Sequence, residues 1–348
     1  MLTQKLKSDI ISAAILAPSA DNSQPWIFDW QDSTLLLRID ATRSGSISDT
    51  NYLLSDIASG SCLENIHIFL ASLGIEHNIE ILPNLDDPLL IAKVQLTGRS
   101  ILPAEATLAS MIPLRQSNRR FPFTPHAKRL TQKLLESAST PLTEAIDCSN
   151  GMQKKVACRA LFKAESLRFQ IKHVHEELFK TVRFNDKEGA QEGMDLRSLN
   201  IEPFARPIFK LASNWPTMAW LNKLGMSYVF GYRSTVLPTK LSPTLLLISP
   251  KENSRQGAIS LGRILERCWL SATAMGLSVQ VYAAPGVFTR NHATIPNEHA
   301  TTLQQITESM LTLNPAGTGG LFLRIGIDKH SSNNARTRRR NLTDFINK

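Results

Sequence analysis

The chain has 348 residues, of which 42% are hydrophobic and 20% are charged, and its formal net charge is +9. This composition excludes a disordered polymer, and the length favours two domain-sized units over one. The positive charge raises nucleic acid as a partner, but the basic residues gather at 115–120, 154–187 and 335–341 without the interleaved aromatic residues of a base-stacking surface. We therefore expect no nucleic acid partner.

The N-terminal segment predicts an amphipathic helix that ends at Pro18. Lys5 and Lys7 precede an apolar run at 10–17, which is also the pattern of a secretory signal. Asp9 interrupts the start and the run is short, so the helix is the better interpretation. No run reaches the roughly 18–20 apolar residues that a membrane span needs, and we expect no membrane partner.

The cysteines and histidines do not form a pattern of ligands. The four cysteines (Cys62, Cys148, Cys158 and Cys268) include no C-x-x-C pair, and the eight histidines show no metal-binding spacing. We expect no disulfide framework, no metal site and a reducing, cytoplasmic location.

Two segments of the chain, 58–81 and 260–282, align without a gap at a constant offset. Apolar residues recur at helical spacing in both, and each helix stops at a glycine, Gly74 or Gly276, that is followed by an apolar residue. The other matched pairs are Gly60 with Gly262, Leu63 with Leu265, and Glu64 with Glu266. Internal duplication explains this match; two unrelated amphipathic helices that look alike are the alternative.

Each matched helix leads into a strand-like segment, and a second strand follows at 89–98 or at 321–328. A proline-bounded stretch at 103–113 separates the repeats. We expect a first half at 1–102 and a second half at 103–348.

An insertion at about 185–243 interrupts the second half. It is rich in aromatic and turn-forming residues. Such a segment is either a lid over a site, with Trp220, Tyr228 and Tyr232 as the candidate lid residues, or a small core of its own.

Several short motifs together resemble the nitroreductase family, which binds FMN. The segment APSADNSQPW at 17–26 resembles the flavin-contacting loop of that family, and RQSNR at 115–119 matches its R-x-S-x-R. The helix at 260–277, the R-I-G at 324–326 and the basic ending at 339–346 match further hallmarks. The resemblance touches most of the chain, and it is closest to the tandem, single-chain (Acg-type) branch.

The resemblance implies an α+β fold in which two tandem nitroreductase-like units form a pseudo-dimer of mixed sheets flanked by helices. Ordinary members are homodimers that hold each FMN between two chains. Here the first half has the A-P-S loop without R-x-S-x-R, and the second half has R-x-S-x-R without the loop. The missing parts are complementary, so we expect one FMN per chain and a monomer or weak homodimer.

The resemblance also implies the residues that contact FMN. They are Ser19, Asn22, Gln24, Arg115, Ser117, Arg119, Pro285, Gly286, Arg339 and Arg340. Arginine suits the phosphate because its planar fork of donors stays charged, which favours Arg115 with Arg339 or Arg340. The short polar side chains of the A-P-S loop suit the pyrimidine edge of the ring.

The remaining roles follow from the same resemblance. Arg119 takes the place beside flavin N1 and O2, Ser117 the place beside the phosphate or ribityl oxygens, and Pro285-Gly286 the turn toward N5. Each motif alone has a plainer explanation: the segment at 115–120 suits a solvated helix start, and the segment at 335–341 a solvated tail.

The expected function is an FMN-dependent oxidoreductase that passes hydride from NAD(P)H through flavin N5 to a small, electron-poor acceptor. The flavin carries the redox chemistry, so we name no catalytic residue. The alternative is a non-catalytic protein that sequesters FMN under a closed lid.

Overall fold

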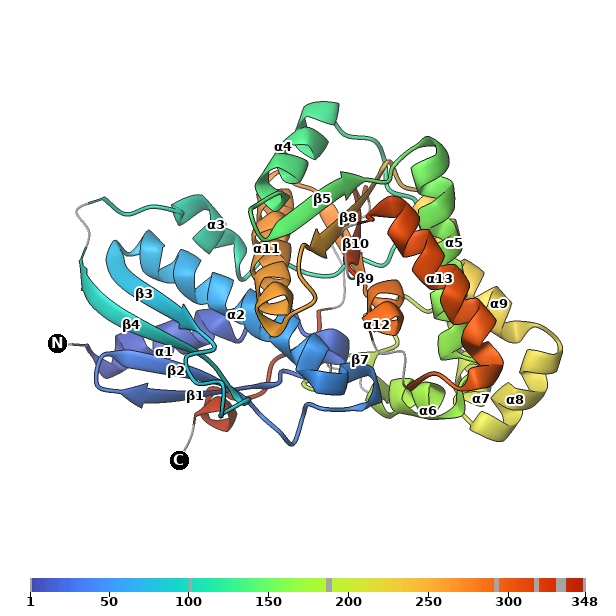
Figure 1. The fold of residues 1–348 in the computed structure, drawn as a ribbon, viewed down its shortest axis with the longest axis horizontal. Helices are drawn as coiled ribbons and strands as arrows, with labels where there is room; N and C mark the ends of the chain where they lie inside the picture. Colours follow the sequence, from blue (N-terminus) through green and yellow to red (C-terminus); the bar gives the residue numbers. More distant parts are fainter. Residues whose placement is uncertain are drawn as a thin grey trace.

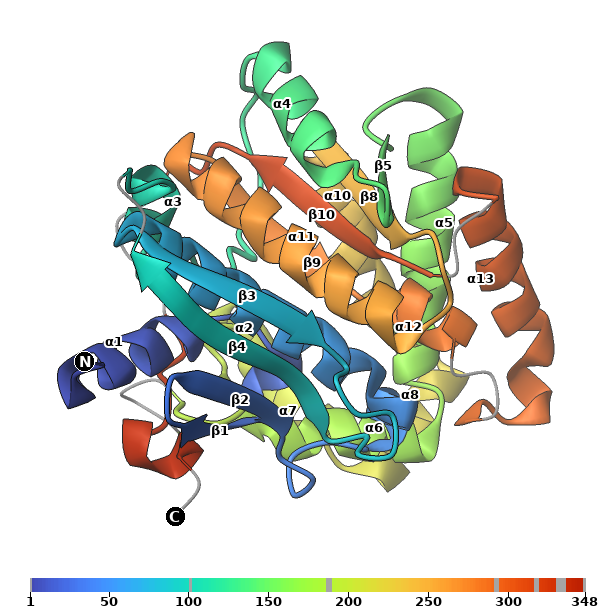
Figure 2. The same cartoon turned by 60° about the vertical axis from the view of Figure 1, so that its left-hand side comes forward.

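The computed structural model describes residues 2–99, 102–185, 190–290, 294–315, 319–329 and 336–346. Two four-stranded sheets lie on either side of a central pair of helices, α2 (Leu53–Ser72) and α11 (Arg255–Ala274) (Figure 1). These helices pack directly on each other, and Figure 2 shows both running between the sheets.

The two sheets have the same topology. The first contains β1 (Trp26–Gln31), β2 (Thr34–Ile39), β3 (Ile75–Ile81) and β4 (Leu90–Arg99) in the order β1-β2-β4-β3. The second contains β5 (Thr143–Asp147), β8 (Thr244–Pro250), β9 (Ser278–Tyr282) and β10 (Leu321–Gly326) in the order β5-β8-β10-β9. In each sheet the central helix follows the second strand, so the predicted tandem architecture is confirmed.

The strands in each sheet pair antiparallel. Isolated parallel bridges extend one edge of each sheet: Phe28 with Ile346 at β1, and Ser117 with Val279 at β9. These bridges give the mixed sheets that the resemblance implies.

The contact between the central helices is reciprocal. A Cβ added at Gly60 would lie 2.0 Å from the carbonyl oxygen of Ile259, and one added at Gly262 would lie 1.9 Å from the carbonyl oxygen of Ile57. Ile57 precedes Gly60 by the same step as Ile259 precedes Gly262. Exchange of equivalent partners is the signature of a two-fold contact, here within one chain.

The two sheets are covered differently. One face of the first sheet packs on α1 (Gln4–Ala14) and α2, and β3 alternates between buried and exposed residues. In the second sheet β8 and β10 are buried along their whole length. Helices α11 and α4 (Lys128–Ala138) cover one face, and α5 (Gly151–Arg168), α12 (Ala284–Arg290) and α13 (Ala300–Leu313) cover the other.

The insertion is longer than the sequence indicates. It joins β5 to β8 and begins at Gly151 with α5, whereas the predicted start was residue 185. The helical pattern of α5 does not distinguish it from the helices of the repeat. Its remaining elements are α6 (Lys172–Thr181), β6 (Val182–Arg183), β7 (Met194–Asp195), α7 (Arg206–Ala212), α8 (Trp215–Lys223), α9 (Met226–Gly231) and α10 (Leu237–Lys240).

Segments outside the sheets connect the halves. Helix α3 (Ala106–Met111) contacts both α2 and α11. The C-terminal segment 336–346 returns to the first half, where Phe345 is fully buried in the core of the first sheet. Residues from both ends of the chain therefore meet beside β1.

Candidate functional site

The loop that follows α1 carries a strained backbone. Asp21, Asn22 and Gln24 have φ angles of 49°, 57° and 53°, in the left-handed region that non-glycine residues rarely occupy. Ser19 Oγ accepts a hydrogen bond from the Gln24 backbone N–H at 3.0 Å. Such conformations persist only where surrounding contacts hold them, and they gather at functional sites.

Two guanidinium groups from distant parts of the chain close the C-terminal end of α1. Arg115 donates to the carbonyl of Leu16 at 2.6 Å. Arg339 donates to the carbonyl of Ala17 at 3.0 Å and to Asn22 Oδ1 at 2.9 Å. These carbonyls directly follow the end of α1 at Ala14, so the two cations fix the start of the loop.

A buried carboxylate lies beside these cations. Glu266 of α11 is fully buried, and its Oε1 lies 3.0 Å from Arg115 Nε. Burial raises the pKa of Glu266 to about 7, against the opposing effect of Arg115 and Arg339. Burial likewise lowers the pKa of Arg339 to about 9.

These partners differ from the predicted ones. The resemblance assigns Arg115 and Arg339 to a phosphate, whereas in the structure their donors serve loop carbonyls and Glu266. Glu266 was not named as a site residue, although its match to Glu64 in the repeat placed it on the central helix. Nothing in the local sequence indicated that it would lie beside Arg115.

A segment of the insertion, residues 190–198, crosses the loop; we call it the strap. Its Gln191 carbonyl accepts from Asn22 Nδ2 at 3.1 Å and from Gln24 Nε2 at 2.7 Å. The backbone N–H of Arg340 donates to Gln24 Oε1 at 3.1 Å. Two amide groups from the first half therefore converge on one carbonyl oxygen from the second.

The other end of the strap rests on the second arginine of R-x-S-x-R. Arg119 donates to the carbonyl of Ser198 at 2.9 Å and lies 3.5 Å from Met194 Sδ. Burial lowers the pKa of Arg119, while the charge of Asp21 opposes this shift. Burial raises the pKa of Asp21, and the nearby charges of Arg168 and Arg119 oppose that shift.

The site thus combines groups from both halves in a buried, charged setting. Asp21 of the loop interacts with Arg119 and with Arg168 of α5, and Glu165 and Glu177 add negative charge nearby. Arg168 is also held by Glu165, at 3.3 Å. Asp21 and Arg168 are site residues that the sequence motifs did not reveal: Asp21 is a variable position of the motif, and Arg168 belongs to the insertion.

Three other predicted site residues have contacts within the fold itself. Ser117 bridges to Val279 at the edge of the second sheet. Pro285 and Gly286 are buried in the first turn of α12. A Cβ at Gly286 would lie 2.2 Å from the carbonyl oxygen of Gly320, so glycine is required for this close approach.

The three predicted lid residues are exposed to solvent. Trp220, Tyr228 and Tyr232 are 59%, 53% and 43% exposed, on the outer side of the insertion. The ring of Tyr228 stacks on Phe162 of α5, at a centroid separation of 5.9 Å. Among the described residues of the insertion, the strap hydrogen-bonds to the A-P-S loop and Arg168 of α5 interacts with Asp21 of that loop.

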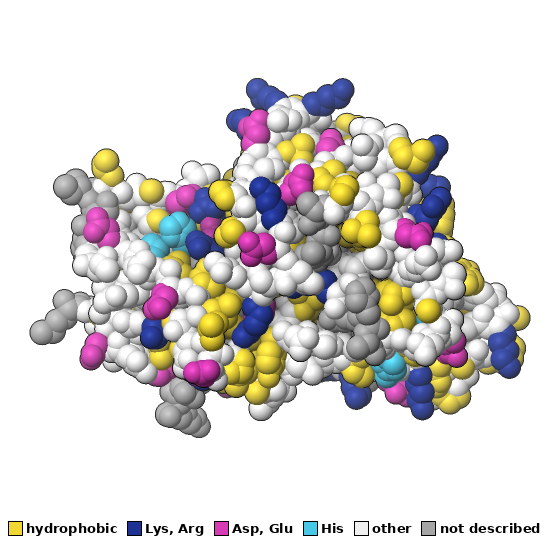
Figure 3. All heavy atoms as spheres, in the orientation of Figure 1, with side chains coloured by type: hydrophobic (Ala, Val, Ile, Leu, Met, Phe, Trp, Pro, Cys, Tyr) yellow, Lys and Arg dark blue, Asp and Glu magenta, His cyan; other side chains and the backbone are white. Residues whose placement is uncertain are grey.

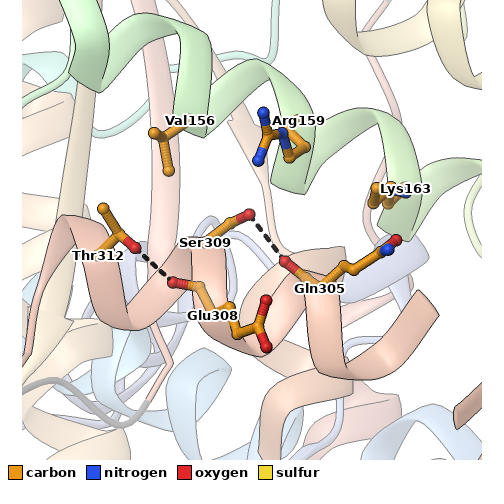
Figure 4. Close-up of a pocket in the computed structure, with 7 residues that line it drawn as sticks. All are labelled: Val156, Arg159, Lys163, Gln305, Glu308, Ser309 and Thr312. Carbon is orange, nitrogen blue, oxygen red and sulfur yellow. Dashed lines mark hydrogen bonds between the residues drawn. The ribbon is translucent and has the colours of Figure 1, made fainter. Parts of the chain in front are cut away.

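A surface hollow between α5 and α13 lies apart from these residues (Figure 4). Its lining includes Arg159, Lys163 and Glu308, and none of the predicted site residues. Among the described residues, no group of three or more His, Cys, Asp or Glu could hold a metal ion. No described helix has the length and apolar content to cross a bilayer.

Comparison with known proteins supports the family resemblance. No family model matches the chain. It is 28% identical over 283 residues to "Putative NAD(P)H nitroreductase acg" of Mycobacterium tuberculosis, in strains CDC 1551 / Oshkosh and ATCC 25618 / H37Rv, and the match covers 80% of each chain. These relatives confirm the resemblance to the nitroreductase family and to its Acg-type branch.

A solved structure is also similar. It is the FMN and NADPH-dependent nitroreductase NfnB from sphigopyxis sp. strain HMH, at 14% identity and a TM-score of 0.38, with 69% of this chain and 97% of that chain covered. Superposition at this level is poor. The α+β architecture therefore rests on the two sheets described above.

Proposed function

We propose that this protein is an FMN-dependent oxidoreductase of the nitroreductase type, with one FMN per chain. One observation carries the proposal: the loop of the first half and Arg119 of the second half meet in one partly buried, polar site under the strap. The proposed halves are residues 1–102 and 103–348, with the C-terminal segment returned to the first.

The donor set fits the ring edge of a flavin. Asn22 and Gln24 both donate to a carbonyl oxygen, that of Gln191, and carbonyl oxygens are the acceptors on the pyrimidine edge. Arg119 would add a fixed positive charge on that side, and Asp21 an acceptor. A bound flavin would replace the Gln191 carbonyl with its own acceptors, which requires the strap to shift.

The arginines predicted to hold the phosphate have other partners in this structure. Arg115 and Arg339 already serve carbonyl oxygens, and Glu266 balances their charge. We propose that these two arginines are positioning residues, which hold the loop in its left-handed conformation. Their effect on flavin binding would then act through Asn22 and Gln24.

In this proposal the residues of the chain bind FMN, orient it and shield its ring edge from water. When bound, FMN supplies hydride transfer between NAD(P)H and a small, electron-poor acceptor. The partly buried cation at Arg119 would favour a reduced, anionic ring, because a charge that is already fixed in place costs no reorganisation during the reaction. The strap would exclude water from the ring edge.

A second function is favoured by the strap itself. Its contacts with Asn22, Gln24 and Arg119 close the loop from outside. A strap that stayed closed over a bound flavin would shut out NAD(P)H, and the protein would then store FMN without turnover.

Steady-state oxidation of NADPH or NADH, with menadione or nitrofurazone as acceptor, separates the two functions. Turnover that is lost in Gln24→Leu and kept in Gln132→Leu, a matched change on the exposed face of α4, supports the oxidoreductase. A yellow protein that stays oxidised under excess NADPH and NADH contradicts it and supports storage.

A further inference from the structure

The outer helices of the insertion present apolar side chains to solvent. Phe204 is 81% exposed, Leu211 63%, Trp220 59% and Leu224 68%. The same surface includes Ile208, Tyr228, Val229, Tyr232 and Leu241, each at least two-fifths exposed. We call this set the outer apolar face.

The spacing of these residues is that of a buried helix face. Phe204, in the 3-10 turn before α7, and Ile208 and Leu211 of α7 recur at helical intervals, a stripe that normally points into a core. On the core side of the same helices, Ala212 and Met218 already pack into the core and are fully buried. The outer apolar face is therefore a second, uncovered stripe, and not a failure to pack the first.

The charge around this face is mainly positive. The segment 202–250 contains Arg206, Lys210, Lys223, Arg233 and Lys240 and one acidic residue, Glu202, which pairs with Arg233. Each of its lysines is exposed and directly precedes an exposed leucine of the outer apolar face: Lys210-Leu211, Lys223-Leu224 and Lys240-Leu241. Figure 3 shows hydrophobic and basic side chains, with a few acidic ones among them, at the end of the molecule formed by α7 and α8.

We propose that the outer apolar face docks on the surface of an anionic lipid bilayer. Exposed apolar and aromatic side chains would enter the boundary between headgroups and acyl chains, and the lysines would pair with anionic headgroups. Tryptophan and tyrosine favour that boundary because their rings are apolar and their tips are polar. The absence of a helix able to span a bilayer among the described residues agrees with attachment to one side.

Charge selects lipid over a second copy of the chain. A two-fold dimer through this face would bring its basic residues together, and like charges across an interface oppose association. An anionic bilayer offers the opposite charge and accepts apolar side chains in the same plane. The inference revises the expectation of no membrane partner, and it does not depend on the cofactor.

The test is sedimentation of the purified full-length protein with vesicles. We expect binding to phosphatidylcholine vesicles that contain phosphatidylglycerol, weaker binding at high salt, and little binding to pure phosphatidylcholine. A nitroxide-labelled lipid should quench tryptophan fluorescence in the wild type and quench it less in Trp220→Phe. Equal binding to both kinds of vesicle, or none to either, overturns the proposal.

Matched variants separate this face from net charge. Lys210→Gln with Lys223→Gln should lower the partition coefficient roughly 25-fold, since one lysine near an anionic surface contributes roughly five-fold. Lys128→Gln with Lys133→Gln, on the exposed side of α4 at the other end of the molecule, should leave it unchanged (Figure 1).

Apolar variants complete the test. Trp220→Ser with Leu224→Ser should lower the partition coefficient at least roughly ten-fold, because buried apolar area sets the binding strength. Leu85→Ser, at an 86% exposed position outside the face, should not change it. Thermal unfolding checks that each variant is folded. A dimer that only the apolar variants disrupt, or tight binding to DNA without binding to vesicles, contradicts the lipid assignment.

Discussion

The two halves of this chain share a topology and differ in what joins their first two strands. In the first half β1 and β2 are joined by the two residues Asp32 and Ser33, whereas in the second half α5 to α10 lie between β5 and β8. In the first sheet β3 exposes every second residue, while in the second sheet α5 of the insertion joins α12 and α13 to cover the outer face. A repeated framework can thus stay symmetric at its central helices while its connections diverge.

The difference extends to the site. The first half supplies the strained loop, and the second supplies Arg115, Arg119, Glu266 and the strap. The place in the second half that matches the A-P-S loop is the short turn at 139–142, which has no such contacts to an opposite arginine cluster. The asymmetry predicts one site per chain.

The largest effect that we expect is the loss of stability when Arg115, which the second half supplies to the site, is removed. In Arg115→Ala the buried Glu266 loses its paired charge and the Leu16 carbonyl loses its donor, so we expect a loss of about 4 kcal/mol in the free energy of unfolding. Urea denaturation measures it. Arg129→Ala, on the exposed side of α4, is the control. An equal loss of stability in that variant would contradict the role of Arg115 as the partner of Glu266 and of the Leu16 carbonyl.

Glu266 should make stability depend on pH. Its folded-state pKa of about 7 exceeds the ordinary value of 4.5, so its contribution is full below pH 4.5 and is lost as pH rises through 7. The loss amounts to about 3 kcal/mol over that window. Glu266→Gln should flatten the slope between pH 4.5 and 7, measured by urea denaturation at several pH values.

The exposed Glu136→Gln on α4 is the matched control, and it should keep the wild-type slope. A slope that is the same in the wild type and in Glu266→Gln would show that the buried carboxylate does not bind its proton more tightly in the folded state.

The symmetry of the central helices predicts matched losses from the two halves. Gly60→Ala and Gly262→Ala each place a Cβ against a backbone carbonyl of the other helix, so each should cost about 2 to 3 kcal/mol of stability. Gly98→Ala, whose Cβ would lie 3.5 Å from a flexible glutamate side chain, should cost far less. Costs that differ widely between Gly60 and Gly262 would break the two-fold description.

The smallest effect concerns the strap. Asn22→Gly removes the amide that donates to Gln191 and relieves the left-handed strain at that residue, so the strap should loosen without loss of the fold. We expect amide hydrogen exchange in residues 190–198 to rise about five-fold, as for one lost hydrogen bond of about 1 kcal/mol. Ser139→Gly, in the matching turn of the second half, should leave that exchange unchanged.

The repeat, the central helices and the main strands were predictable because their signals are local. Helical periodicity, Gly74 and Gly276 as helix stops, and the apolar strands are readable within short windows of sequence. The start of the insertion was not predictable, because α5 has the pattern of an ordinary buried helix.

The candidate site was predictable only in part. The motifs indicated that the A-P-S loop and the R-x-S-x-R segment would face one another, and hydrogen bonds now link Arg339 and Arg115 to that loop. The partner of Arg115 was not predictable, because Glu266 becomes its counter-ion only when α11 packs beside α3, the helix that precedes Arg115. The exposure of Trp220 was not predictable either, because it depends on which side of α8 packs against the core.

The most direct test of the central claim is the ratio of flavin to polypeptide in the purified protein, from its visible spectrum and its protein concentration. Two fused halves that assemble one site predict one FMN per chain, and a ratio near zero in Gln24→Leu. Two flavins per chain, or none after incubation with excess FMN, would contradict the account.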